Sequence, residues 1–124
     1  MAFAEPSGVG RDDGLYRWQE RCGKKLKAMS GWNNKSDGSS GNGTDEFGFS
    51  ALPGGSKGSS KSNFVDIGNR GYWWSAREHN SGDKAVLCDI YYNLEYINCY
   101  YYDKSSLSSV RCVEDIIFNN PVNP

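Results

Sequence analysis

The sequence predicts an α+β domain with a small antiparallel sheet, long irregular loops and one or two short helices. Residues 84–103 alternate apolar and polar side chains on both sides of a turn, and residues 71–76 form an aromatic run typical of a strand. The intervening segments are rich in glycine, serine and asparagine, which favours loops. We expect a flexible leader over 1–13, a single domain over 14–118 and a frayed tail over 119–124.

The segment after the leader is predicted to form a helix. From Gly14 to Met29, apolar side chains recur at spacings of three and four residues, which is typical of a short amphipathic helix. Lys24, Lys25 and Lys27 lie near the end of this helix, where positive charge opposes the helix dipole favourably. We therefore expect these three lysines on a solvated face.

The middle of the chain is predicted to be mostly irregular. Residues 30–43 carry too little apolar area to form a regular element, so we expect an exposed loop. Phe47, Phe49 and Leu52 are expected to anchor the segment that follows.

A strand is predicted over residues 71–76, where alternation places Tyr72 and Trp74 on one face and Trp73 on the other. Of the two tryptophans, we assign Trp74 to the core. A last strand is expected over residues 107–113, after a turn.

The hairpin within residues 84–103 carries the most specific prediction. A two-residue turn at Asn93-Leu94 places Cys88 opposite Cys99 and Ile90 opposite Ile97. One face of the hairpin is then mostly apolar. The opposite face carries Asp89, Tyr91, Asn93, Tyr96, Asn98, Tyr100 and Tyr102.

This second face has the composition of a recognition surface. Tyrosine and asparagine supply rigid amphipathic rings and adaptable amides, which are enriched where proteins hold their partners. A structural alternative stays open, because tyrosine favours strands and paired rings stabilise a hairpin without binding anything. We expect Arg77, His79 and Asn80, in the loop before the hairpin, to extend the binding surface.

The four cysteines indicate disulfides. None of their spacings matches a C-x-x-C metal or redox motif, and three pairings are available to an even set of four. The hairpin register favours Cys88 with Cys99, which leaves Cys22 for Cys112. Four reduced thiols in a cytosolic protein are the alternative.

Charge and composition exclude several function classes. A net charge of −1, from 14 basic and 15 acidic residues, leaves no footprint for nucleic acid, and no apolar run of about 20 residues predicts a membrane span. His79 is the only histidine, so nucleophilic catalysis lacks its base and we expect no enzyme. We expect no cofactor. If the fold holds a structural calcium ion, Asp45 and Glu46 are the candidate ligands.

Four segments together resemble a known bacterial family, the Fibrobacter succinogenes major paralogous domain. They are residues 23–32 (GKKLKAMSGW), 43–55 (GTDEFGFSALPGG), 71–76 (GYWWSA) and 104–113 (KSSLSSVRCV). The resemblance implies a C-type lectin-like fold, with Trp73 and Trp74 in the region that supports the ligand surface and Cys112 on the terminal core strand. Only residues 14–18 resemble the longer region that precedes the first segment in this family, which implies an N-terminal half that is either abbreviated or supplied by another chain.

The resemblance also implies a function and a location. Proteins of this family are exported or displayed on bacterial surfaces, so we expect an extracellular or surface module, of bacterial or phage origin, that binds a protein or glycan on another cell. The module is expected to be part of a larger surface protein. The composition of residues 89–103 is similar to that of lectin-like proteins diversified by retroelements. Two alternatives stay open: an adhesin-like module without a discrete ligand, and an oxidoreductase similar to formylglycine-generating enzymes, which use paired cysteines.

Overall fold

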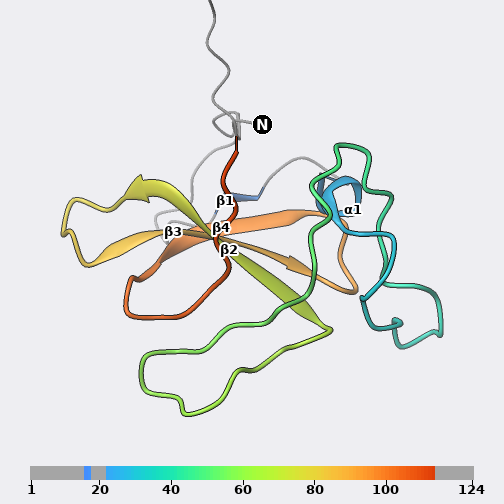
Figure 1. Cartoon of the computed structure of the whole chain (residues 1–124), viewed down its shortest axis with the longest axis horizontal. Helices are drawn as coiled ribbons and strands as arrows, with labels where there is room; N and C mark the ends of the chain where they lie inside the picture. The colour runs from blue at the N-terminus through green and yellow to red at the C-terminus, as the bar shows by residue number, and fades with distance from the viewer. Residues whose placement is uncertain (1–15, 18–21, 114–124) are drawn as a thin grey trace, which may run out of the picture.

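The computed structural model describes residues 16–17 and 22–113, which form a mostly β domain with one short helix (Figure 1). The elements are β1 (Tyr16–Arg17), α1 (Cys22–Leu26), β2 (Arg70–Glu78), β3 (Lys84–Tyr91) and β4 (Ile97–Asp103). The four strands make one antiparallel sheet in the order β1-β4-β3-β2. A small antiparallel sheet with long loops was therefore predicted correctly.

The predicted register of the hairpin is confirmed. Cys88 pairs with Cys99 and Ile90 with Ile97 in the ladder between β3 and β4. A disulfide joins the two cysteines, with an S–S distance of 2.07 Å. Because side chains alternate along paired strands, this register alone sorts the hairpin into two faces. We call the face with the disulfide the inner face and the opposite one the outer face.

The turn of the hairpin is wider than predicted. Strand β3 ends at Tyr91 and β4 begins at Ile97, so five residues connect them where the sequence predicted a two-residue turn. The Lys27 ammonium group explains the difference, because it donates to the carbonyls of Tyr92 at 3.2 Å and Leu94 at 2.9 Å. The connection therefore folds around a cation that comes from a distant part of the chain.

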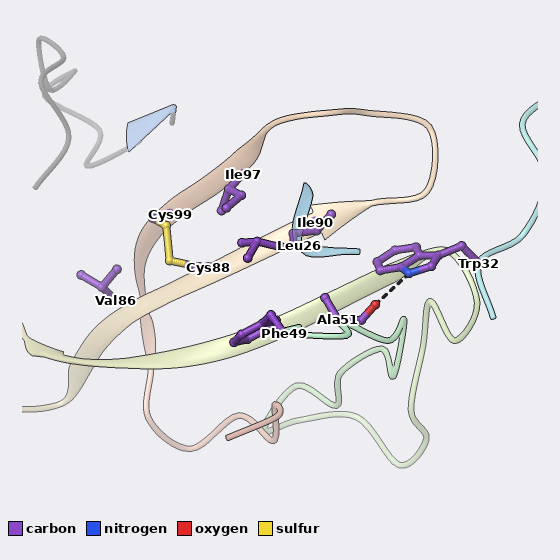
Figure 2. Close-up of a cluster of buried hydrophobic side chains, with 9 residues drawn as sticks. All are labelled: Leu26, Trp32, Phe49, Ala51, Val86, Cys88, Ile90, Ile97 and Cys99. Atoms are coloured by element: carbon purple, nitrogen blue, oxygen red, sulfur yellow. Dashed lines mark hydrogen bonds between the residues drawn. A yellow bond between two sulfur atoms is a disulfide. The ribbon is translucent and has the colours of Figure 1, made fainter. Parts of the chain in front are cut away.

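The hydrophobic core lies on the inner face. Trp32, Phe49 and Ala51, which come from the loops after α1, pack with Leu26 against the buried residues of the hairpin (Figure 2). The indole Nε1 of Trp32 donates to the buried Ala51 carbonyl at 2.9 Å, which satisfies the ring's polar atom. The hairpin contributes Val86, Cys88, Ile90, Ile97 and Cys99.

Of the three predicted loop anchors, only one is buried. Phe49 packs in the core, whereas Phe47 and Leu52 are 58% and 56% exposed. The carboxylate of Asp45 explains this arrangement, since it accepts hydrogen bonds from the backbone N–H and the hydroxyl of Ser50 and closes a tight loop. This loop leaves Phe47 at its exposed tip.

The helix is much shorter than the 14–29 prediction. Tyr16 and Arg17 belong to β1, which pairs with β4, and among the described residues of this stretch (16–17 and 22–29) only Cys22–Leu26 is helical. The carbonyls of Lys24 and Lys25 accept from the backbone of the 44–46 loop, which replaces the continuing helix. Gly23 also lies so close to the connection between β3 and β4 that an added Cβ would sit 2.8 Å from the Tyr96 carbonyl.

The expectation that Lys27 is solvated was wrong, because this residue is 2% exposed. Its ammonium group lies 5.0 Å from the centre of the Trp32 ring, in addition to its two carbonyl partners. Burial is the main reason that its pKa falls to about 8.

The last predicted strand is present only in part. Within 107–113 the structure has isolated bridges, Lys57 with Leu107 and Trp73 with Ser109. The second bridge places this segment along the outer edge of β2, where the Trp74 N–H donates to the Ser109 carbonyl at 3.0 Å. The predicted leader over 1–13, the tail over 119–124 and residues 114–118 lie outside the described residues.

Candidate functional site

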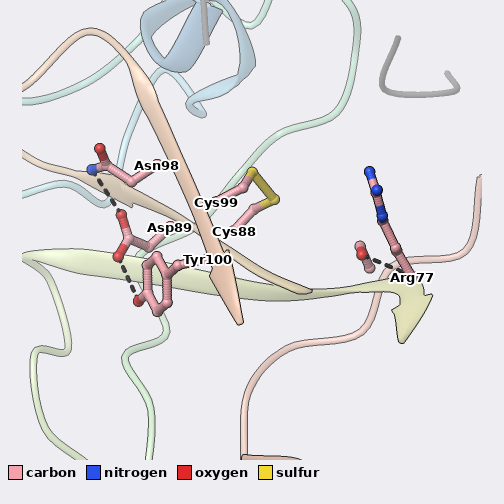
Figure 3. Close-up of a disulfide and its surroundings, with 7 residues drawn as sticks. Arg77, Cys88, Asp89, Asn98, Cys99 and Tyr100 are labelled. Atoms are coloured by element: carbon pink, nitrogen blue, oxygen red, sulfur yellow. Dashed lines mark hydrogen bonds between the residues drawn. A yellow bond between two sulfur atoms is a disulfide. The ribbon is translucent and has the colours of Figure 1, made fainter. Parts of the chain in front are cut away.

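The predicted binding residues divide between two places. Asp89, Asn98 and Tyr100 come together on the outer face, opposite the disulfide (Figure 3). Figure 3 also shows Arg77 extending from the far end of β2, away from these three residues. The structure therefore does not merge the hairpin face and the loop after β2 into one surface.

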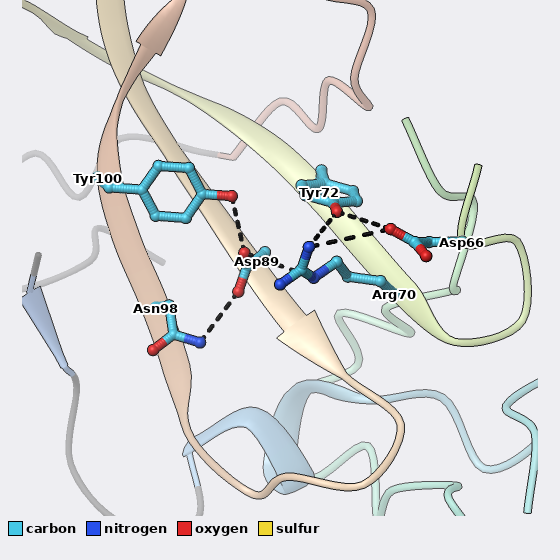
Figure 4. A network of polar contacts seen from close by, with 6 residues as sticks. All are labelled: Asp66, Arg70, Tyr72, Asp89, Asn98 and Tyr100. Carbon is cyan, nitrogen blue, oxygen red and sulfur yellow. Dashed lines mark hydrogen bonds and ion pairs between the residues drawn. The ribbon is translucent and has the colours of Figure 1, made fainter. Parts of the chain in front are cut away.

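Asp89 lies at the centre of the outer face. Its side chain accepts a hydrogen bond from Asn98 Nδ2 at 3.1 Å and another from the Tyr100 hydroxyl at 2.7 Å. The Nε of Arg70 lies 3.7 Å from the same carboxylate. These contacts join side chains of all three long strands (Figure 4).

Arg70 extends this network to a second carboxylate. Its Nη1 donates to the Tyr72 hydroxyl at 2.5 Å, and that hydroxyl donates to Asp66 at 3.0 Å. The guanidinium carbon also lies 3.5 Å from the centre of the Tyr91 ring. Arg70 therefore holds two tyrosine rings of the outer face while it compensates the charge of Asp89.

Burial dominates the protonation of this network. It raises the pKa of Asp89, although the bonds from Tyr100 and Asn98 and the charge of Arg70 act in the opposite direction. The pKa of the Tyr100 hydroxyl is raised by burial and then by the Asp89 charge, so the phenol stays protonated. Tyr100 thus remains a donor to Asp89 at any ordinary pH.

The expectation that the whole outer face is displayed was wrong at its centre. Asp89 is only 1% exposed, and its two partners Asn98 and Tyr100 are half-buried. The reason that Asn98 and Tyr100 turn toward the sheet is that a carboxylate in its middle strand loses contact with water and needs polar partners.

The rest of the outer face is more accessible. Tyr102 is 43% exposed and packs edge-to-face with Tyr100 at 6.0 Å, while Asn93 is exposed in the connection after β3. Tyr91 is half-buried beneath Arg70. Tyr96 is also half-buried, but it lies in the connection beside α1, away from the Asp89 network.

The assignment of the two tryptophans was reversed. Trp73 packs against the core, with its ring 5.9 Å from Phe49 in an edge-to-face contact. Gly71 makes room for it, because a Cβ there would sit 2.2 Å from the indole. Trp74 lies on the outer face instead, half-buried opposite Leu87. Trp73 therefore cannot be a direct contact for a ligand on the outer face.

The loop between β2 and β3 is held by local hydrogen bonds. His79 Nδ1 lies 2.8 Å from the Ser81 hydroxyl, which in turn donates to Asp83. The His79 ring contacts Tyr101, an inner-face residue, at 4.7 Å. Asn80 and Arg77 are exposed. This loop thus packs toward the inner-face side of the sheet.

A shallow depression of about 300 Å³ opens where β2 is irregular. The register between β2 and β3 shifts between Trp74 and Glu78, which is typical of a β-bulge. The lining residues are Trp74, Ser75, Ala76, Glu78, Ala85 and Lys104. Sequence reasoning missed this feature, although the small residues after the aromatic pair were a signal for it.

Comparison with known proteins agrees with the resemblance of the four segments. The Fibrobacter succinogenes major domain family matches residues 8–114. The chain belongs to this family. No curated protein and no solved structure matches the chain significantly. Within residues 16–17 and 22–113, no helix is long and apolar enough to cross a bilayer.

The second disulfide expected for this member of the Fibrobacter succinogenes major domain family does not form. Cys22 and Cys112 are free thiols, the first half-buried and the second exposed. Cys22 follows β1 at one edge of the sheet and packs against the core, whereas the segment before Cys112 runs along β2 at the other edge. The sheet therefore separates the two cysteines.

The carboxylates considered for calcium have protein partners. Asp45 accepts from Ser50, which is the main cause of its lowered pKa, and Glu46 lies 3.8 Å from Lys25. Among the described residues of this family member, no group of three or more His, Cys, Asp or Glu side chains is placed to hold a metal ion. Both carboxylates are therefore used to hold the loop around residues 45–50, Asp45 within the loop and Glu46 toward α1.

Proposed function

We propose that this domain is a secreted or surface-displayed binding module, not an enzyme, that recognises a protein or glycan through the outer face of its sheet. One observation carries the proposal: tyrosine rings of this face are held in place by the Asp89 and Arg70 network before any partner arrives. Rings fixed in advance lose little conformational entropy on binding, which favours affinity.

The contacts assign different roles to the predicted residues. Tyr102 and Asn93 are exposed enough to touch a partner, and Tyr91 presents a ring backed by Arg70. Asp89, Asn98 and Tyr100 act as positioning residues, because their polar atoms are used within the sheet. The proposed contact surface is therefore narrower than the full tyrosine-rich face.

The location and the fold type are part of the same proposal. The Cys88–Cys99 disulfide supports a location outside the cytoplasm, since such bonds persist in oxidising compartments. We also propose a relationship to C-type lectin-like domains and a place within a larger bacterial or phage-associated surface protein. We propose that retroelement diversification acts at exposed positions such as Tyr102 and Asn93 and not at Asp89, because substitution of Asp89 would leave its partners unpaired.

One alternative has support of its own. An adhesin-like module without a discrete ligand is favoured by the burial of Asp89, because the polar network then serves stability alone. The oxidoreductase alternative has no such support. Its chemistry requires an accessible pair of cysteines, whereas Cys88 and Cys99 are buried and already bonded.

The proposal is tested by screening glycan arrays and cell-surface protein arrays with the full chain, beside the variants Tyr102→Ser and Tyr91→Ser. We expect at least one specific ligand whose binding weakens about tenfold in either variant, which is the scale for a buried aromatic contact at an interface. Phe47→Ser is the matched control, because Phe47 is an exposed aromatic residue of a loop whose backbone bonds to α1 and whose Phe49 packs in the inner-face core.

Two results would count against the proposal. The absence of any specific ligand on both arrays would favour the adhesin-like alternative. A ligand whose binding is equally strong in Tyr102→Ser, Tyr91→Ser and wild type would place recognition on another surface.

A further inference from the structure

The depression beside the β2 bulge has the composition of a small-molecule subsite. Trp74 provides an aromatic wall, and Ala76 and Ala85 provide small apolar surfaces. Glu78 and Lys104 supply the charged groups of the lining, with Lys104 Nζ donating to Glu78 Oε1 at 2.6 Å. Apolar walls with a few converging polar groups are typical of ligand sites.

The backbone explains why the sheet is hollow at this place. Trp74 pairs with Leu87 and Glu78 with Ala85, so residues 75–77 lie opposite Val86 alone. The extra residues bend β2, and the bulge is a regular way to redirect side chains at the end of a strand. Ala85 is small, which leaves space between its cross-strand neighbours Glu78 and Tyr102.

The charges at the depression indicate a neutral ligand. Glu78 and Lys104 form an ion pair, so together they present one acceptor group and one donor group without net charge. A ligand carboxylate would meet Glu78, and a ligand amine would meet Lys104, so each would gain one contact and be repelled by the other. A hydroxyl both donates and accepts, and neighbouring hydroxyls can therefore bind both partners.

We propose that this depression binds one neutral pyranose unit of a glycan, with Trp74 against an apolar face of the sugar ring and with Glu78 and Lys104 on its hydroxyls. The size is suitable, since about 300 Å³ lies at the lower end of the range for small-molecule sites. Tyr102, which pairs with Ala85 next to the depression, extends the aromatic surface toward a second sugar unit. This inference rests on the proposed binding function and names its ligand class.

The test is an NMR titration of the ¹⁵N-labelled full chain with methyl glycosides of glucose, galactose, mannose and N-acetylglucosamine. At least one glycoside is expected to give saturable shifts of the Trp74 indole N–H and of the amides of residues 75–78 and Lys104. Glucuronic acid and glucosamine, which carry opposite charges, are expected to bind more weakly than the neutral glycoside.

Two exposed substitutions identify the site without unfolding the protein. Glu78→Gln and Lys104→Met are each expected to weaken glycoside binding about tenfold, the scale of one hydrogen bond to a charged group. Glu46→Gln is the matched control, because Glu46 forms a similar exposed ion pair with Lys25 and is expected to leave binding unchanged.

The inference is overturned if none of the glycosides shifts these signals at its highest soluble concentration. It is also overturned if the shifts persist unchanged in Glu78→Gln and Lys104→Met. Failure of the two proposals can be distinguished. A protein ligand on the arrays that depends on Tyr102, combined with no glycoside binding, would leave the binding module intact and remove only the sugar subsite.

Discussion

The two faces of β3 are both buried, but they differ in composition: the inner face is apolar, whereas the outer face combines buried Leu87 and Ala85 with the polar Asp89 network. On the inner face, Ile90 and Cys88 pack among apolar side chains and a disulfide. On the outer face, Asp89 is equally inaccessible, and it is held there by Asn98, Tyr100 and Arg70. Burial in this protein is therefore not a sign of apolar character.

The comparison also separates stability from recognition. Apolar packing tolerates changes of side chain that conserve volume, whereas a buried carboxylate requires each of its partners. The inner face can thus accept apolar substitutions of similar volume. The Asp89 network, in contrast, cannot lose a single member without leaving a polar group unpaired. A recognition surface is consequently expected around the edge of that network and not within it.

The largest expected effect is at the centre of the outer face. Asp89→Ala leaves Arg70, Asn98 and Tyr100 without their common partner, so we expect the free energy of unfolding to fall by about 3 to 5 kcal/mol. Urea denaturation of the variant and the wild type measures this difference in the free energy of unfolding. Asp66→Asn is the control, because Asp66 also contacts Arg70 but is exposed, and asparagine tolerates its φ of 65°. For the control we expect a loss below about 1 kcal/mol. A loss that small for Asp89→Ala would contradict the role given to the network.

A somewhat smaller loss is expected on the inner face. Ile90→Ala removes buried methyl and methylene groups from the core, and we expect about 3 kcal/mol of destabilisation in the same urea experiment. Ile90→Val, which keeps most of the volume, should cost about 1 kcal/mol. If both variants lost equally little, the core described here would not be the main source of stability.

Loss of the disulfide is expected to destabilise the protein less than Asp89→Ala or Ile90→Ala. Its two cysteines are 11 residues apart, and the chain-entropy model gives about 2 to 3 kcal/mol for closing such a short loop. The double variant Cys88→Ala/Cys99→Ala measures this, with Cys112→Ala as a control that should change stability by no more than about 0.5 kcal/mol. Thiol titration of the wild type in denaturant, without reductant, should find two reactive groups, Cys22 and Cys112.

The smallest expected effect is the pH dependence of stability that the buried Lys27 causes. Lys27 has a pKa of about 8 in the folded protein, below the ordinary 10.5, so the unfolded state binds more protons above pH 8. Stability should therefore rise with pH, by about 1 kcal/mol from pH 7 to 9. Lys27→Met should abolish this rise, and an unchanged pH dependence in that variant would assign it to other groups.

The hairpin and its disulfide could be predicted because they depend on local rules. Alternation along the strands places Cys88, Ile90 and their partners on one face, and pairing from a turn sets their register. The wider connection did not disturb the register, because Cys88 still meets Cys99 across the ladder. The family was likewise predictable, since its motifs are linear.

The helix and the lysines were not predictable to the same degree. The spacing of apolar residues over 14–29 indicated a helix, yet carbonyls of Lys24 and Lys25 accept from a loop that begins some twenty residues later. Gly43 of the same loop region lies against Lys27, and the connection between β3 and β4 supplies carbonyl partners for its ammonium group, so a residue expected in solvent becomes a buried cation. Such contacts have no signal in the local pattern.

The sequence by itself determined which side chains share a face, because a strand alternates with a period of two whatever surrounds it. Only the tertiary structure decided what each face meets. It placed Arg70 over Tyr91, enclosed Asp89, exchanged the roles of Trp73 and Trp74, and separated Cys22 from Cys112 across the sheet. The physical reason is that burial depends on neighbours distant along the chain, and local periodicity contains no information about them.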